Sequence, residues 1–243
     1  MSVPWYQSSR RYLSRALNRS QMDWEYALYQ MACLAAFAPG KVYRTTRYHR
    51  QTKKQWSRDD PAFLVVFVLA LFSACSLIGL VYSGWSLGIA LRLALSVVLL
   101  WLGVGSVLLS TFMFLFANRF LIDPTAMYSL DSWTDPECAR VEWLYAFDVH
   151  CNALFGGVFL PLVVVQGALY AFLIRNRLSS CMLHVWGLTY YWYITWLGYD
   201  ILPFLRRTQV FLLPIPLLSM VALVATAFGR INLTEWTWNW LLP

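Results

Sequence analysis

Charged residues are scarce in this chain. They make up 13% of its 243 residues, whereas hydrophobic residues make up 59% and aromatic residues 17%. A soluble domain typically has about 25% charged residues, because these ions keep its surface hydrated. So low a charge content excludes an ordinary soluble domain. The composition therefore predicts an integral membrane protein.

Paired cysteines and short catalytic motifs are also absent. The five cysteines form no C-x-x-C pair, so the sequence suggests neither a disulfide framework nor a zinc module. It contains no H-E-x-x-H, no G-x-S-x-G and no phosphate-binding glycine loop. We therefore expect no metal site, no cofactor and no enzymatic activity.

Positive charge is concentrated at the beginning of the chain. Residues 1–60 contain eleven of the 19 Lys and Arg residues but only four of the 12 acidic residues, and residues 61–243 contain eight of each sign. Segments rich in Lys and Arg stay on the cytosolic side of a membrane. The distribution predicts a cytosolic basic arm at 1–60 that can meet anionic lipid headgroups or an acidic partner.

Long apolar runs fill the rest of the chain. A helix needs about 20 apolar residues to cross the hydrocarbon of a bilayer. Five segments approach this length, at about 61–82, 94–117, 152–174, 182–202 and 209–229. We therefore predict an all-α polytopic membrane protein, in which residues 61–243 form a bundle of five transmembrane helices with a cytosolic loop at 118–151. With the N-terminus in the cytosol, five crossings place the C-terminus in the lumen.

Two helices are expected within the arm. The first covers about 23–38, where Asp23 is a suitable N-cap and Pro39 and Gly40 are a stop signal. This helix is largely apolar and too short to cross the membrane, which favours an interfacial helix that lies flat or packs under the bundle. The second helix covers about 41–59 and is basic.

The basic helix is expected to contact a partner or lipid. Helical spacing places Arg47, Arg50, Lys54 and Arg58 along one side. Tyrosine and tryptophan, which are favoured at headgroup depth, occur between the basic residues. The residues expected to make these contacts are Arg47, Arg50, Lys53, Lys54, Trp56 and Arg58.

The sequence R-D-D-P indicates where the first transmembrane helix starts. Asp60 occupies a position typical of a helix N-cap, and Pro61 occupies the first helical position, where its missing N–H costs nothing. Asp59 and Asp60 also complement the positive end of the helix dipole. These three residues therefore predict a helix start at the boundary between water and lipid.

A group of polar residues lies around the start of the third transmembrane segment. Asp148 and His150 point to different sides of a helix, so they cannot easily bind one metal ion. The topology brings Asp200 and Arg206 to the same depth, where ionisable groups are costly. We expect a polar collar at the cytosolic mouth, with Asp200 paired to Arg206, that holds helices together or docks a partner. Its members are Glu142, Asp148, His150, Asn152, Asp200 and Arg206.

Four stretches resemble a known family. They are QMDWEYALYQM at 21–31, VYRTTRYHRQTKKQWSRDDPAF at 42–63, VEWLYAFDVHCNALF at 141–155 and LGYDILPFLRR at 197–207. Together they resemble the Unc-fifty family, small multispan Golgi proteins of eukaryotes, over most of the chain from about residue 10. The stretch at 122–138 departs from some relatives, and its role stays open.

The resemblance implies residence in Golgi or other early secretory membranes and a role in vesicular trafficking. Family members are linked to the large Arf guanine-nucleotide exchange factors and to surface delivery of membrane cargo. An RNA-binding activity has also been attributed to them. The family offers no catalytic residues to transfer.

Two alternatives remain open at this point. One is a transporter or lipid-handling protein that uses the polar collar of spans three and four. The other is RNA binding by the arm, where basic residues alternate with Tyr43, Tyr48 and Trp56.

Overall fold

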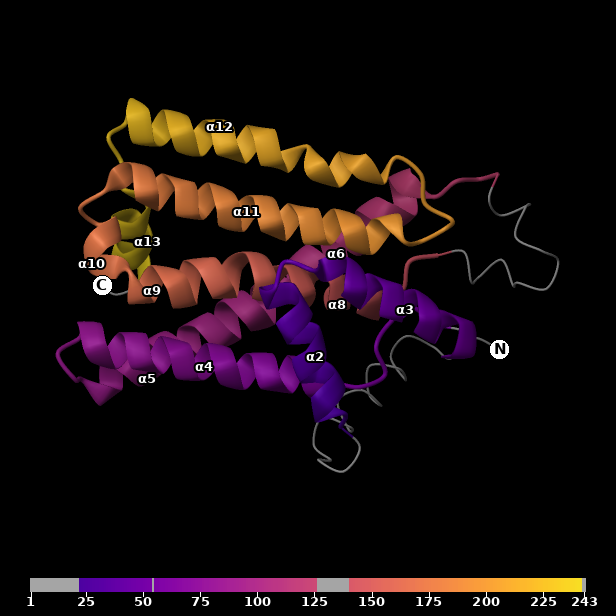
Figure 1. Cartoon of the computed structure of the whole chain (residues 1–243), viewed down its shortest axis with the longest axis horizontal. Coiled ribbons are helices and arrows are strands. Elements are labelled where there is room, and N and C mark those ends of the chain that lie inside the picture. The colour runs from indigo at the N-terminus through magenta and orange to yellow at the C-terminus, as the bar shows by residue number, and fades with distance from the viewer. Residues whose placement is uncertain (1–21, 54, 126–139, 242–243) are drawn as a thin grey trace. The chain divides into compact units, whose positions relative to one another are not determined.

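Helices make up the regular structure of the chain. The computed structural model describes residues 22–53, 55–125 and 140–241. Within these ranges no β-strand forms, and the one β-type pairing is an isolated bridge between Ile122 and Leu205. This confirms the predicted all-α class. The helices, drawn in Figure 1, are α2 (Trp24–Ala35), α3 (Pro39–Lys53), α4 (Ala62–Tyr82), α5 (Leu87–Ser96), η2 (Val97–Gly105), α6 (Ser106–Phe116), η3 (Ala117–Leu121), α8 (Trp143–Leu154), η5 (Phe155–Val165), α9 (Gln166–Ala168), α10 (Tyr170–Leu173), α11 (Arg177–Asp200), η6 (Thr208–Leu212), α12 (Pro214–Ala227) and α13 (Leu233–Leu241).

Four of the described helical segments are long and apolar enough to cross a membrane. They are Ala62–Tyr82, Leu87–Leu121, Trp143–Ala168 and Thr208–Ala227. The chain is therefore a multispan membrane protein, as predicted, but the expected count of five spans is wrong by one.

The segment predicted at 182–202 is the one that falls short. It belongs to α11, whose 24 residues have a length of about 36 Å, enough to cross a bilayer. Its tyrosines, tryptophans, threonines and His184 lower its mean hydropathy below that of the four qualifying segments. The lumenal C-terminus was deduced from five crossings, so the count of four removes the basis of that deduction.

Two of the spans begin earlier than predicted. The second begins at Leu87 rather than near 94, because Arg92 lies within α5 and does not end the helix. The third begins at Trp143 rather than near 152. The polar residues around Asp148 are consequently part of a helix and not of the loop before it.

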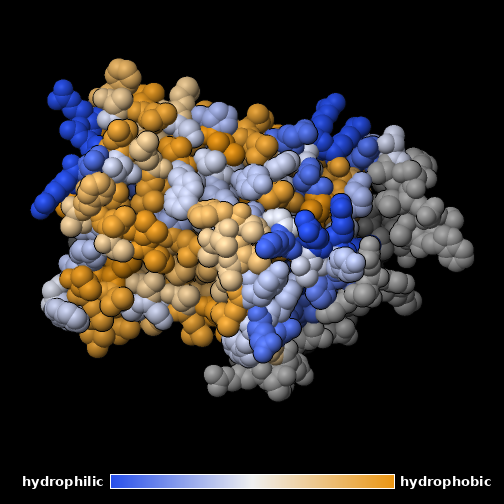
Figure 2. Space-filling view, in the orientation of Figure 1, coloured by the Kyte–Doolittle hydropathy of each residue, from blue (hydrophilic) through white to orange (hydrophobic). Residues whose placement is uncertain are grey.

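Large apolar side chains cover the outside of the spanning helices. Leu69 and Leu77 on α4, Leu108 on α6 and Leu217 on α12 are all more than half exposed. Figure 2 shows the hydrophobic surface over α4 in orange and the hydrophilic surface over α3 in blue. An exposed apolar surface of this kind is expected where helices contact lipid.

The chain divides into two compact units. Unit 1 consists of Met1–Val66, Ser106–Asn152 and Thr195–Val210, and unit 2 consists of Phe67–Gly105, Ala153–Ile194 and Phe211–Pro243. Unit 1 contains the basic arm and every member of the predicted polar collar.

Within unit 2, α11 packs against η5 at backbone contact distance. A Cβ atom added at Gly157 would lie 2.4 Å from the backbone nitrogen of Tyr191, and one added at Gly187 would lie 2.6 Å from the carbonyl oxygen of Gly157. Small residues let helices approach this closely in membrane proteins. Pro161 lies within the π-helical segment η5, and local π geometry can satisfy the backbone groups that a proline leaves free in a membrane helix.

We predict that Gly157→Val destabilises unit 2, because its side chain would force α11 away from η5. The expected loss is about 1–3 kcal/mol, measured as a lower unfolding temperature of the detergent-solubilised protein. Gly88→Ala is the matched control, since a Cβ atom at Gly88 meets no atom within 4 Å. Equal unfolding temperatures for the two variants would contradict the close helix contact.

Candidate functional site

The junction segment, defined as residues 55–60, links α3 to α4 within unit 1. The basic helix was predicted to continue to about 59, but α3 ends at Lys53 and the junction segment is not helical. Arg58 therefore does not share a helix face with Arg47 and Arg50, which corrects the predicted row. Lys54 lies outside the described residues.

Carboxylates at the start of the third span hold the backbone of the junction segment. The carboxylate of Glu142 accepts hydrogen bonds from the backbone N–H groups of Trp56 at 3.0 Å and Ser57 at 3.1 Å, and from the Ser57 hydroxyl at 2.7 Å. The Asp148 carboxylate accepts from the next backbone N–H, that of Arg58, at 2.7 Å. Three consecutive N–H groups are satisfied in this way, and a helix is no longer needed to satisfy them.

Arg58 and Asp148 form an ion pair inside unit 1. The Nε atom of Arg58 lies 3.4 Å from Oδ1 of Asp148, and the two side chains are only 14% and 8% exposed. The guanidinium also donates to Oδ1 of Asn152 at 2.7 Å, to the carbonyl oxygen of Asp148 at 3.2 Å and to Oε1 of Gln30 at 3.0 Å. A buried charge pair with further hydrogen bonds of this kind is costly to break from one side.

The two aspartates before Pro61 have separate structural roles. Asp60 accepts from the backbone N–H of Ala62 at 2.9 Å, which confirms the predicted helix start, although α4 begins at Ala62, one residue after Pro61. Its other oxygen accepts from the backbone N–H of Asp23 at 2.6 Å. Asp23 in turn caps α2 by accepting from the N–H of Tyr26, as predicted. Asp59 accepts from the side-chain amide of Gln55.

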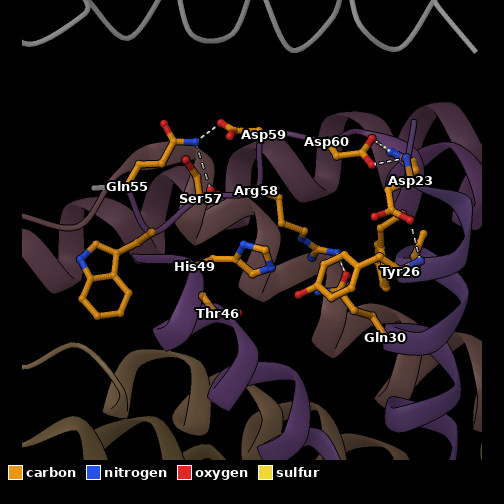
Figure 3. A pocket seen from close by; sticks show the side chains of 14 residues that line it. Asp23, Tyr26, Gln30, Thr46, His49, Gln55, Ser57, Arg58, Asp59 and Asp60 are labelled. Carbon is orange, nitrogen blue, oxygen red and sulfur yellow. Dashed lines mark hydrogen bonds between the residues drawn. The ribbon is translucent and has the colours of Figure 1, made fainter. Parts of the chain in front are cut away.

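A cavity of about 270 Å³ lies between α2, α3 and the junction segment. Figure 3 shows its labelled side chains, with Arg58 pointing toward Gln30 and the ring of His49 facing the cavity from α3. The rings of His49 and Tyr26 pack edge to face at 5.5 Å, and burial raises the pKa of the Tyr26 phenol, which keeps it neutral. Among the described residues no group of three His, Cys, Asp or Glu side chains could hold a metal ion.

The predicted polar collar separates into distinct sets of contacts. Glu142, Asp148 and Asn152 meet the junction segment, but His150 lies 3.0 Å from the Ser106 hydroxyl instead. The expected pairing of Asp200 with Arg206 is wrong. Asp200 accepts from the Thr208 hydroxyl at 2.6 Å, and Arg206 lies 3.7 Å from Asp123.

The bridge between Ile122 and Leu205 explains the partner of Arg206. It aligns residues 121–123 with residues 204–206, and the backbone N–H of Arg206 donates to the carbonyl of Leu121. This alignment brings Arg206 to Asp123. The collar on which the transporter hypothesis depended is therefore not formed as one ring.

Two of the predicted contact residues are internal. Trp56 is 7% exposed and packs edge to face against Tyr145 and Phe204, and Arg58 is held by Asp148. Their positions correct the expectation that they contact a partner or lipid. Tyr43 is also buried, so the aromatic surface that RNA stacking requires is reduced to one of its three predicted members.

The exposed basic surface lies on α3. Arg47 is exposed, and Arg50 is partly buried with its guanidinium carbon 5.6 Å from the centre of the Trp56 ring. Lys41 and Arg44, which the sequence reasoning missed, are exposed on the same face as Arg47. Their spacing of three residues, opposite the buried Val42, is the sequence signal that could have identified them.

Sequence comparison gives close relatives but no known structure. The sequence model of the UNC-50 family matches residues 12–242. A protein unc-50 homolog from Dictyostelium discoideum is 37% identical over 227 residues, covering 92% of this chain and 83% of that protein. Homologs from Danio rerio and Homo sapiens are 39% and 37% identical over 237 and 233 residues, each covering 90% of this chain and 82% of the homolog. No solved structure matches the chain.

We predict that Arg58→Ala and Asp148→Ala each lower stability by about 3–5 kcal/mol, because each leaves an uncompensated charge inside unit 1. The double variant should cost clearly less than the sum of the two single variants. Thermal unfolding in detergent measures all three, with Arg47→Ala as the exposed control. Additive losses would contradict the ion pair.

Proposed function

The chain belongs to the UNC-50 family, and from that premise we propose that it acts in vesicular protein trafficking in Golgi and early secretory membranes. It acts without catalysis, by presenting a cytosolic surface to the machinery that exchanges guanine nucleotide on Arf GTPases. In this way it supports delivery of membrane cargo to the cell surface. Family membership by itself supports only that the chain is a membrane protein of the unc-50 type.

The exposed basic face of α3 is the observation that supports a cytosolic surface for the Arf exchange machinery. Arg44 and Arg47 lie one turn apart on that face, outside the spanning segments and close in sequence to the start of α4. Basic residues on a rigid element attract an acidic partner and increase its association rate. A soluble exchange factor with an acidic surface is a partner of suitable chemistry.

The junction segment supports this proposal because it fixes the orientation of α3. The segment follows α3, and its backbone is bonded to Glu142, directly before the third span, and to Asp148 within it. The edge-to-face contact of His49 with Tyr26 adds a second attachment, to α2. A basic face that is held in place loses less conformational entropy on binding than a flexible tail does.

The orientation of the arm is part of the proposal. Eleven Lys and Arg residues precede Pro61, and this excess favours a cytosolic N-terminus whether four or five helices cross the membrane. The basic face of α3 is then accessible to soluble proteins of the cytosol.

Reversing the charge of α3 should disrupt partner binding without unfolding the protein. We expect Arg44→Glu combined with Arg47→Glu to weaken co-purification of a large Arf exchange factor at least about tenfold, which corresponds to 1.4 kcal/mol. The unfolding temperature and the Golgi location should not change. The matched control is Arg175→Glu combined with Arg177→Glu, which reverses two exposed arginines of unit 2. Undiminished co-purification with the α3 variant would refute the proposed surface.

Protease added to sealed Golgi vesicles should remove a tag from the N-terminus of the protein. This follows from the positive charge of residues 1–60. A lumenal marker protein that resists digestion until detergent is added is the control for vesicle integrity. A protected N-terminal tag would place α3 away from every cytosolic partner and exclude the proposed function.

A further inference from the structure

The outer face of α2 is apolar, and the helices of the described residues leave it exposed. Leu28 is 55% exposed and Tyr29 49% exposed, and Ala32 on the same face is exposed as well. The opposite face, with Ala27 and Leu34, is buried in unit 1. No charged residue occurs from 26 to 40, so no charge beyond the first turn of α2 favours its solvation by water.

Hydrogen bonds fix α2 at the level where the first span begins. The Asp60 carboxylate accepts from Ala62, the first residue of α4, and also from Asp23, the N-cap of α2. Two turns further along α2, Gln30 accepts from Arg58, which lies four residues before the start of α4. Because both points of α2 are tied to residues 58–60, the helix lies beside the start of the first span rather than extending away from it.

The end of α2 contains an unusual exposed aromatic residue. Phe37 has a φ of 55°, and the backbone N–H of Ala38 donates to the carbonyl of Cys33, so the helix ends in a Schellman motif. Glycine is the usual residue at this left-handed position, because a side chain is strained there. Phe37 adopts this conformation while its ring is 57% exposed. A large aromatic ring at a strained, exposed position suits contact with an apolar environment.

A positive charge adjoins this aromatic residue. Lys41, in the first turn of α3, is exposed, and its backbone N–H donates to the carbonyl of Ala38. Aromatic rings and lysines are the residues that anchor a helix at the boundary between headgroups and hydrocarbon. The cytosolic leaflet carries anionic lipids, which complement the charge of Lys41.

We infer that α2 is a lipid-binding element whose outer face, formed by Leu28, Tyr29, Ala32 and Phe37, inserts into the cytosolic leaflet beside the first span. Lys41 contacts anionic headgroups at the end of this face. An uncharged face at the level of the span start suits lipid better than a soluble protein partner. If the partner were a soluble protein, this apolar face would be exposed to water whenever the partner was not bound. The inference rests on the embedding of the chain in a membrane and is independent of the trafficking role.

A photo-crosslinking amino acid at position 29 tests this inference in the full-length protein. The matched control carries the same probe at position 48, because Tyr48 on α3 is also an exposed tyrosine, at 71%. Both variants are reconstituted into vesicles of phosphatidylcholine with and without phosphatidylserine. We expect a phospholipid adduct from the probe at 29, increased by phosphatidylserine, and several-fold less adduct from the probe at 48.

The same probes in native membranes identify the competing occupant. Protein adducts from position 29 without lipid adducts would overturn the inference and assign the face of α2 to a protein partner. Equal lipid labelling at 29 and 48 would also overturn it, because the labelling would then reflect general proximity to the bilayer. A Leu28→Glu change should abolish the lipid adduct at 29 while the unfolding temperature in detergent is retained.

Discussion

The pairing of Arg58 with Asp148 is the interaction on which the rest of unit 1 depends. Arg58 uses its backbone N–H and its guanidinium on the same carboxylate, and it donates to Gln30 of α2 and Asn152 of α8 as well. One side chain thereby connects the arm, α2 and the third span. The cost of burying two charges is offset because nearly every donor of the guanidinium has an acceptor. The position of α2 beside α8 follows from this connection.

The conformation of the junction segment shows tertiary contacts overriding local preference. Residues 41–59 contain no glycine or proline, so helical spacing alone favours a helix through the whole stretch. Glu142 and Asp148 instead accept the N–H groups of residues 56–58, which would otherwise donate within α3. Carboxylates stabilise these donors more strongly than carbonyl groups do, because the hydrogen bonds are charge-assisted. α3 ends at Lys53, and the first of these bonds is made three residues later, at Trp56.

The sequence was sufficient for features that depend on neighbouring residues. Composition predicted a multispan membrane protein, and the caps at Asp23 and Asp60 were predicted from local sequence. It was insufficient where partners are distant, since Trp56 and Glu142 are 86 residues apart. For the same reason the partner of Arg206 was assigned incorrectly. The predicted number of spans was wrong at α11. This helix is long enough to cross a membrane, but its many tyrosines and tryptophans lower its mean hydropathy.

The separation of Arg58 and Asp148 has a consequence for how the protein is made. The two residues are 90 positions apart in the chain, which at about 5–20 residues per second corresponds to roughly 5–20 s of synthesis. During this interval Arg58 has been translated and Asp148 has not. Until then the guanidinium is a positive charge that flanks the start of α4. Only when the third span has been synthesised can the same group form the internal connection to Asp148.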